Sequence, residues 1–133
     1  MPNSSAGSTK ARTTFIALLT AVFFALFAQI TFAQVGDAER GKRAWRAECR
    51  SCHTVDQNYL GPKHRGVLGR RVGKIKGFNF SPALSKSTLV WDAELLNRWL
   101  ADPEQVVKGQ WMGYRIDSAQ TRADLVAYLA TLK

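Results

Sequence analysis

The sequence has few of the residues that cross-link a chain or bind a metal: of 133 residues, two are cysteine, two histidine and two methionine. No segment alternates apolar and polar side chains in the way a half-buried strand does, which argues against a β-sheet protein. The chain is 46% hydrophobic and 22% charged, which excludes a disordered tail and a collagen-like repeat. The apolar residues are too localised for a multi-span membrane protein. One small globular domain is expected.

Charge is absent from residues 13–36, and this stretch contains the longest apolar run of the chain. It follows the basic residues Lys10 and Arg12 and ends in small residues of the kind that precede a cleavage site. These features predict a secretory signal peptide over residues 1–33 and an exported domain over residues 34–133. The alternative is an uncleaved anchor, because about 20 apolar residues suffice to span a bilayer.

Both cysteines fall in one five-residue segment, Cys49-Arg50-Ser51-Cys52-His53. A cysteine pair in an exported protein is typical of a disulfide, and C-x-x-C alone of a redox motif or half a zinc site. C-x-x-C-H indicates covalent attachment of c-type haem, with two thioether bonds and the imidazole of His53 under the iron. Zinc needs four ligands, and His64 is the only further candidate.

Met112 is the only methionine beyond the predicted signal peptide. Its surroundings, Gly109 to Tyr114, resemble a loop more than the periodic stripe of a core helix. A thioether is a soft ligand that favours Fe(II), and a Met/His pair is typical of electron-transfer cytochromes. We therefore expect Met112 to be the second axial ligand, the alternative being a methionine that fills a gap in the core.

Three helices are expected in the domain. Asp37 caps the first, which leads into Cys49, and Asp92 caps the second, which Pro103 ends. The third runs from near Asp117 or Ser118 to the C-terminus. Between them, residues 55–90 are rich in glycine and proline and are predicted to be a wrapping loop without regular elements. A loop of that length is unusual in a compact domain, but a large apolar cofactor would provide a surface on which it can pack.

With these motifs in place, residues 36–133 resemble a class I cytochrome c of the mitochondrial and small bacterial type. The resemblance runs through five segments, GDAERGKRAWRAECRSCHTV, GPKHRGVLGRRVGKIKGFNFSPAL, Trp91 with LNRWLADP, GQWM and DLVAYLATLK. It implies an all-α cytochrome c fold, with three main helices and a long glycine-rich loop around one haem. The haem c would be attached through Cys49 and Cys52, with His53 and Met112 as the ligands of its iron.

The resemblance also implies supporting roles. The carbonyl of Pro62 would orient His53. Arg70 and Trp91 would lie beside a haem propionate, and the first and last helices would cross where Gly41 and Trp45 meet Leu125 and Tyr128.

Four positions depart from the family pattern, and one of them is Phe80, where family members commonly have a tyrosine near the propionate. Lys108 stands where the family usually has proline in the methionine loop, Trp99 replaces a tyrosine close to the axial methionine, and His64 occupies a normally apolar position. His64 is expected to be a histidine at the solvent edge, with a sixth iron ligand as the alternative.

The expected function is single-electron transfer through the haem between larger redox proteins, with no catalytic acid, base or nucleophile. The protein is thus expected to be an electron carrier and not an enzyme. The alternative is a haem enzyme, or a cytochrome that binds a gas or peroxide, in which Met112 dissociates from the iron. The Lys108-Gly109 sequence motivates this alternative.

The charge distribution suggests the partners. No acidic residue lies between Asp56 and Asp92, a segment that contains seven basic ones. Such a surface steers a protein toward acidic docking sites on redox partners, and we expect no nucleic-acid partner. The protein is expected to be a periplasmic monomer, and to contact the membrane only if the N-terminal segment remains as an anchor.

Overall fold

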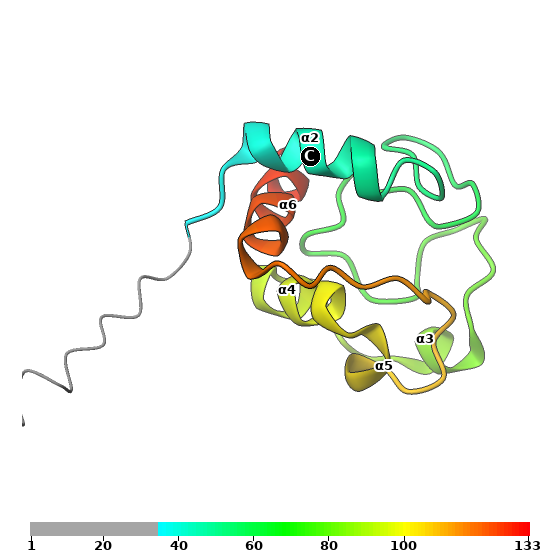
Figure 1. Ribbon diagram of the computed structural model, residues 1–133. Coiled ribbons are helices and arrows are strands. Elements are labelled where there is room, and N and C mark those ends of the chain that lie inside the picture. The colour runs from blue at the N-terminus through cyan, green and yellow to red at the C-terminus, as the bar shows by residue number, and fades with distance from the viewer. Residues whose placement is uncertain (1–34) are drawn as a thin grey trace, which may run out of the picture. The chain divides into compact units, whose positions relative to one another are not determined.

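The computed structural model describes residues 35–133 (Figure 1), so the predicted signal peptide, residues 1–33, lies outside the described residues. No strand is found in residues 35–133, where Arg71 and Val90 form an isolated antiparallel bridge. The expected all-α class is therefore confirmed. The helices are α2 (Ala38–Glu48), α3 (Pro82–Lys86), α4 (Ala93–Ala101), α5 (Pro103–Val106) and α6 (Ala119–Thr131).

The three predicted helices are α2, α4 and α6, and each begins at a capping side chain. The carboxylates of Asp37 and Asp92 accept hydrogen bonds from backbone N–H groups three residues on, at 2.6 and 2.7 Å. The Ser118 hydroxyl does the same at 3.2 Å. Each cap satisfies one of the donors that a helix leaves free in its first turn.

Two short helices, α3 and α5, were not predicted. Both begin with proline at the first helical position, where its missing N–H costs nothing and its fixed φ suits a helix. Ser81 caps α3 and Asp102 caps α5. The prediction that residues 55–90 lack regular elements is thus wrong for 82–86, where the Ser81-Pro82 pair was a start signal.

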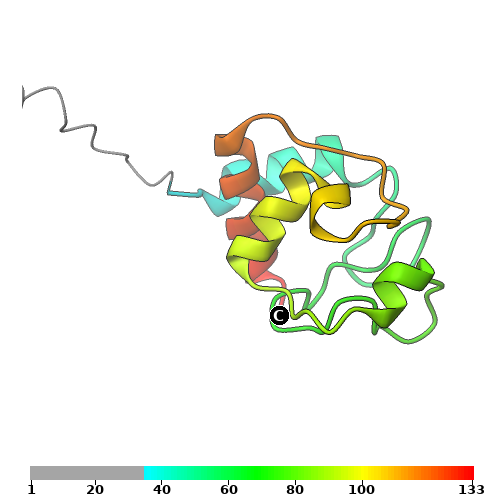
Figure 2. The same cartoon turned by 90° about the horizontal axis from the view of Figure 1, so that it is seen from below.

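Helices α2 and α6 cross closely, and Figures 1 and 2 show them side by side in both views. The crossing depends on Gly41, because a Cβ there would lie 1.9 Å from the backbone oxygen of Asp124 and 2.8 Å from Cβ of Tyr128. The Trp45 ring packs against Tyr128, with centroids 6.1 Å apart. These contacts confirm the expected crossing of α2 and α6 at Tyr128, with Asp124 as the nearest neighbour of Gly41, and α6 also packs against α4.

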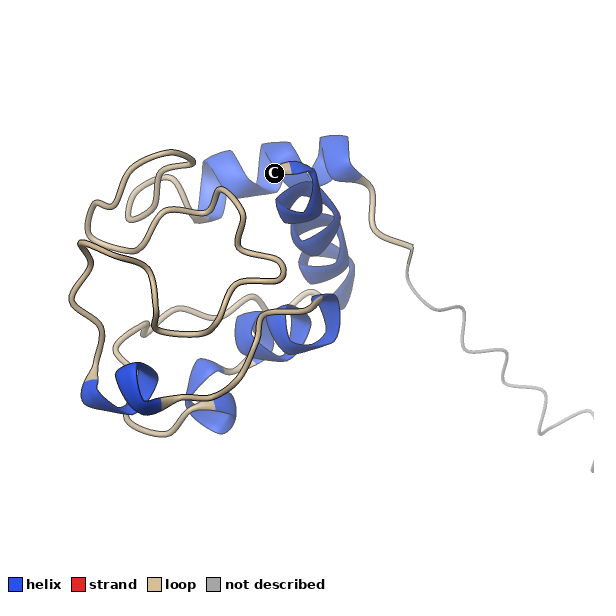
Figure 3. Cartoon of the chain, turned by 180° about the vertical axis from the view of Figure 1, so that it is seen from behind, coloured by secondary structure: helices blue, strands red, loops and turns tan. Residues whose placement is uncertain are grey.

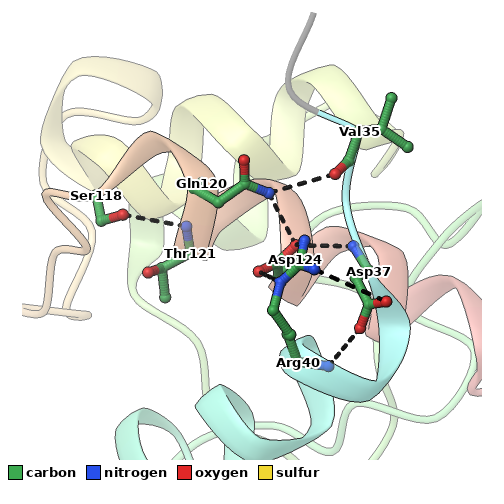
Figure 4. Close-up of polar contacts among 7 residues, drawn as sticks. All are labelled: Val35, Asp37, Arg40, Ser118, Gln120, Thr121 and Asp124. Carbon is green, nitrogen blue, oxygen red and sulfur yellow. Dashed lines mark hydrogen bonds and ion pairs between the residues drawn. The ribbon is translucent and has the colours of Figure 1, made fainter.

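A polar cluster ties α6 to the start of α2 (Figure 4). The buried carboxylate of Asp124 accepts hydrogen bonds from the Arg40 side chain at 2.8 and 2.9 Å, from the Asp37 backbone N–H at 2.7 Å and from Gln120 at 3.0 Å. The hydrogen bonds from Arg40 outweigh burial and hold the pKa of Asp124 well below its usual range.

The loops gather on the side opposite the α2 and α6 crossing, as Figure 3 shows. One hydrophobic core joins α2, α4 and α6 to these loops, through residues such as Val67, Val72 and Ile116. Within residues 35–133, no helix is long and apolar enough to cross a membrane.

Candidate functional site

A cavity of about 510 Å³ lies between the helices and the long loop. Its size falls within the roughly 300–1,000 Å³ typical of cofactor sites. Cys49, Cys52, His53 and Met112, the four predicted site residues, all line it. Residues 59 positions apart in the sequence, His53 and Met112, therefore face one space, whose other walls are mostly apolar.

The two cysteines follow directly from the end of α2. A tight turn brings them to the cavity wall, with the N–H groups of Cys52 and His53 bonded to the Cys49 carbonyl at 3.1 and 2.8 Å. Both thiols are free rather than joined in a disulfide. Burial, with Glu48 and Cys52 nearby, raises the pKa of Cys49 to about 12. A thioredoxin-like redox cysteine has a lowered pKa, so this environment does not match that alternative.

His53 is fixed by its neighbours in the loop. Its Nδ1 donates a hydrogen bond to the carbonyl of Pro62 at 2.7 Å, as the resemblance implies, which leaves Nε2 as the nitrogen for a metal. Burial lowers the pKa of His53, so the neutral imidazole that a metal needs is favoured. Gly61 makes room for the ring, since a Cβ there would lie 2.2 Å from its Cε1 atom.

Met112 reaches the cavity from the segment between α5 and α6. Its side chain is half-buried, and its sulfur accepts a hydrogen bond from the indole Nε1 of Trp99 at 3.1 Å. Trp99 is itself buried in α4 and packs edge-on against Trp91, with centroids 5.2 Å apart. The tryptophan that departs from the family pattern thus still provides a donor beside the methionine.

The loop that carries Met112 is held by the side chain of Glu104. This carboxylate accepts hydrogen bonds from the Gly109 backbone N–H at 2.9 Å and from the Gln110 side chain at 3.3 Å. The Gln110 side chain in turn accepts a hydrogen bond from the backbone N–H of Met112. Gly109 has a φ of +83°, a conformation that glycine adopts without strain. These bonds restrain the loop although Lys108 replaces the proline.

Arg70 and Trp91 also line the cavity. The Arg70 guanidinium donates to the carbonyls of Lys63 and Arg65 at 3.0 and 3.2 Å, and burial lowers its pKa. Among residues 35–133, no carboxylate forms an ion pair with it. A half-buried cation of this kind suits a ligand that carries an anionic group.

His64 lies against His53 rather than at the solvent edge, so that expectation is wrong. The two rings are stacked, with centroids 4.3 Å apart and planes at 21°. Because its ring is stacked on that of His53, His64 does not fit the alternative in which it would be the sixth ligand of an iron that His53 would hold. Burial, with His53 and Arg70 nearby, lowers the pKa of His64 to about 3. Its place at a normally apolar position was the available signal, which sequence reasoning did not use.

The residues fit a covalently attached haem. The cavity is apolar, two free thiols stand at its wall with an imidazole beside them, and a thioether enters from another element. Imidazole nitrogen and thioether sulfur are donors that suit iron.

Comparison with known proteins agrees with this chemistry. The family described as Cytochrome c matches residues 38–133. Cytochrome c2 of Rhodopila globiformis is 40% identical over 104 residues, covering 76% of this chain and 98% of the relative. Cytochrome c of Euglena viridis is 38% identical over 101 residues, covering 74% of this chain and 99% of the relative.

Solved structures are similar as well. Cytochrome cH from Methylobacterium extorquens superposes with a TM-score of 0.68 at 41% identity, covering 72% of this chain and 99% of that one. Ferricytochrome c2 from Rhodopseudomonas palustris gives a TM-score of 0.67 at 37% identity, covering 73% and 99%.

Proposed function

The chain belongs to the cytochrome c family, and we propose that residues 34–133 form a periplasmic electron carrier whose haem iron is ligated by His53 and Met112. The protein is an electron carrier with a covalently bound c-type haem, as its cytochrome c2 relatives are, and not an enzyme. The observation that supports the ligand assignment best is that Cys49, Cys52, His53 and Met112 all line one apolar cavity.

The bound haem supplies a one-electron Fe(III)/Fe(II) couple. The chain contributes the rest. Pro62 and Gly61 hold the His53 ring in place, and Trp99 donates to the Met112 sulfur. The mostly apolar walls of the cavity would leave little water around a bound haem, which would disfavour the more highly charged Fe(III) state. Because Glu104 restrains the methionine loop, we expect both ligands to stay bound in both oxidation states, which keeps the reorganisation on electron transfer small.

The location of the carrier is part of the proposal. The basic, apolar and small-residue regions of residues 1–33 favour a cleaved export signal, and the family match begins after them, at residue 38. Covalent attachment of haem to an exported chain fits the periplasm. A retained anchor facing the periplasm is the alternative, and an N-terminus at Gln34 in the purified protein would exclude it.

The protein acts with redox partners, as cytochromes c2 do, and we propose that it docks as a monomer on acidic surfaces of those partners. Besides Arg65, which pairs with Asp56, four basic side chains of the acid-free segment are exposed, namely Arg71, Lys74, Lys76 and Lys86. Long-range attraction from such a face raises the rate of encounter and is weakened by salt.

The test of the ligand assignment is the visible and near-infrared spectrum of the oxidised and reduced holoprotein. We expect a reduced c-type spectrum, the weak long-wavelength band of methionine bound to Fe(III), and no change on adding carbon monoxide. A missing band in the wild type, or ready carbon monoxide binding, would overturn Met112 ligation and favour a haem enzyme or a gas-binding cytochrome.

A further inference from the structure

Three aromatic side chains, those of Trp45, His64 and His53, contact one another in a row from α2 to the candidate iron ligand. The indole Nε1 of Trp45 donates a hydrogen bond to Nδ1 of His64 at 2.7 Å, and the two rings meet edge-on with centroids 6.0 Å apart. The His64 ring then lies on the face of His53, with centroids 4.3 Å apart. The Pro62 carbonyl binds the edge of His53, so the ring is held at an edge and on a face.

The position of His64 is itself fixed at both ends. Its backbone N–H donates to the carbonyl of Thr54, the residue after His53, at 3.0 Å. An indole N–H can only donate, so Nδ1 of His64 must accept and its proton must be on Nε2. Trp45 is 7% exposed and sits in α2, which makes it a rigid anchor for this bond. The apolar residue usual at this position could accept no such bond.

We propose that His64 is a positioning residue that, anchored by Trp45, sets the rotational orientation of the His53 ring. This role is distinct from binding the iron, because the His64 ring is stacked on the His53 ring and so lies on the side of the cavity from which His53 would bind the iron. It rests on the proposed function only in requiring His53 to ligate the iron. If His64 has this role, two contacts fix the plane of the His53 imidazole: the hydrogen bond to the Pro62 carbonyl and the stacked ring of His64.

The orientation of an axial imidazole is visible in the paramagnetically shifted haem methyl signals of the oxidised protein, measured by proton NMR. The His64→Asn variant keeps an acceptor for Trp45 but removes the ring. Trp45→Phe removes the donor and leaves both imidazoles. Asp124→Asn is the control, since it weakens the contact between α2 and α6 without lining the cavity.

We expect His64→Asn to change the spread of the methyl shifts, Trp45→Phe to change it in the same direction by less, and Asp124→Asn to leave it unchanged. The double variant should show no larger change than His64→Asn. If His64→Asn yields no holoprotein, Trp45→Phe carries the test. An unchanged pattern in the test variants, or an equal change in the control, overturns the positioning role.

The wild-type spectrum separates this inference from the proposed function. If the wild type lacks His/Met ligation, the proposed function itself has failed. If the wild type has it and removing the His64 ring leaves the methyl pattern unaltered, only the positioning role is overturned.

Discussion

The indole nitrogen of Trp99 lies 3.1 Å from the thioether sulfur of Met112, so a helix side chain donates a hydrogen bond to the proposed iron ligand. The bond withdraws electron density from the sulfur and makes it a poorer donor to Fe(III). We expect Trp99→Phe to lower the reduction potential by roughly 40 mV, which corresponds to about 1 kcal/mol for one electron. Equilibrium redox titration measures the change.

The matched control is Trp111→Phe, the same substitution at an exposed neighbour of Met112. It should shift the potential much less. Equal shifts in the two variants would show that loss of indole near the loop, and not the hydrogen bond, sets the potential.

Glu104 should decide how firmly Met112 stays bound. In Glu104→Ala, the loop loses the carboxylate that holds Gly109 and Gln110, so we expect carbon monoxide to bind the reduced protein more readily. The methionine band should also be lost at a lower temperature. Gln105→Ala, at the exposed next position in α5, should behave as the wild type. Unaltered carbon monoxide binding in Glu104→Ala would contradict the restraint.

Gly61 should tolerate no side chain, because a Cβ would lie 2.2 Å from the His53 ring. Since Pro62 fixes that ring, it cannot move aside freely, and we expect Gly61→Ala to lower the stability by roughly 1–3 kcal/mol and reduce the yield of haem-bound protein. Gly113→Ala is the control within the cavity lining, since no atom of the described residues lies within 4 Å of a Cβ there. Denaturant unfolding and haem quantification measure both effects, and normal values for Gly61→Ala would refute the close approach.

The link between Arg40 and Asp124 predicts a pH dependence of stability. The folded pKa of Asp124 lies below its unfolded value of about 4, so its contribution is complete above that pH and is lost as the pH falls. At pH 7 we expect Asp124→Asn to cost roughly 1–3 kcal/mol. The difference from wild type should shrink below about pH 4. Urea unfolding at several pH values tests this, and a difference that persists at low pH would contradict it.

The exposed basic face should govern encounter with anions. We expect Lys76→Glu to slow oxidation of the reduced protein by hexacyanoferrate(III) at low ionic strength, and the effect to fade as salt is added. Arg43→Glu, an equal charge change in α2 outside the acid-free segment, should slow it less. If the oxidation rates of the two variants fall equally, the rate depends on the net charge of the protein and not on where the basic side chains lie.

Local signals made much of this architecture predictable from sequence. Asp37, Asp92 and Ser118 cap the three main helices because each cap acts within one turn of its own position. The Cys49-to-His53 motif is equally local. Met112 was a different kind of prediction, since its approach to the cavity depends on how α4, α5 and the loop pack. It rested on its being the single methionine after residue 33, in a loop-like segment, and on the family resemblance.

The features that sequence reasoning missed depend on contacts between distant segments. His64 lies 19 positions from Trp45, and nothing in the pattern around either residue indicates that their side chains are hydrogen-bonded. The role of Glu104 in holding Gly109 could not be predicted for the same reason, because the hydrogen bond depends on how α5 and the following loop pack.

The crossing of α2 and α6 has a consequence for biosynthesis. Helix α2 ends at the residue before Cys49, yet the partner that covers Gly41 is the last helix of the chain. A polypeptide that is exported from its N-terminus exposes both cysteines long before α6 arrives. Under the proposed export, the thiols would therefore be accessible for haem attachment before α6 is present, and packing of α6 on α2 would complete the fold afterwards.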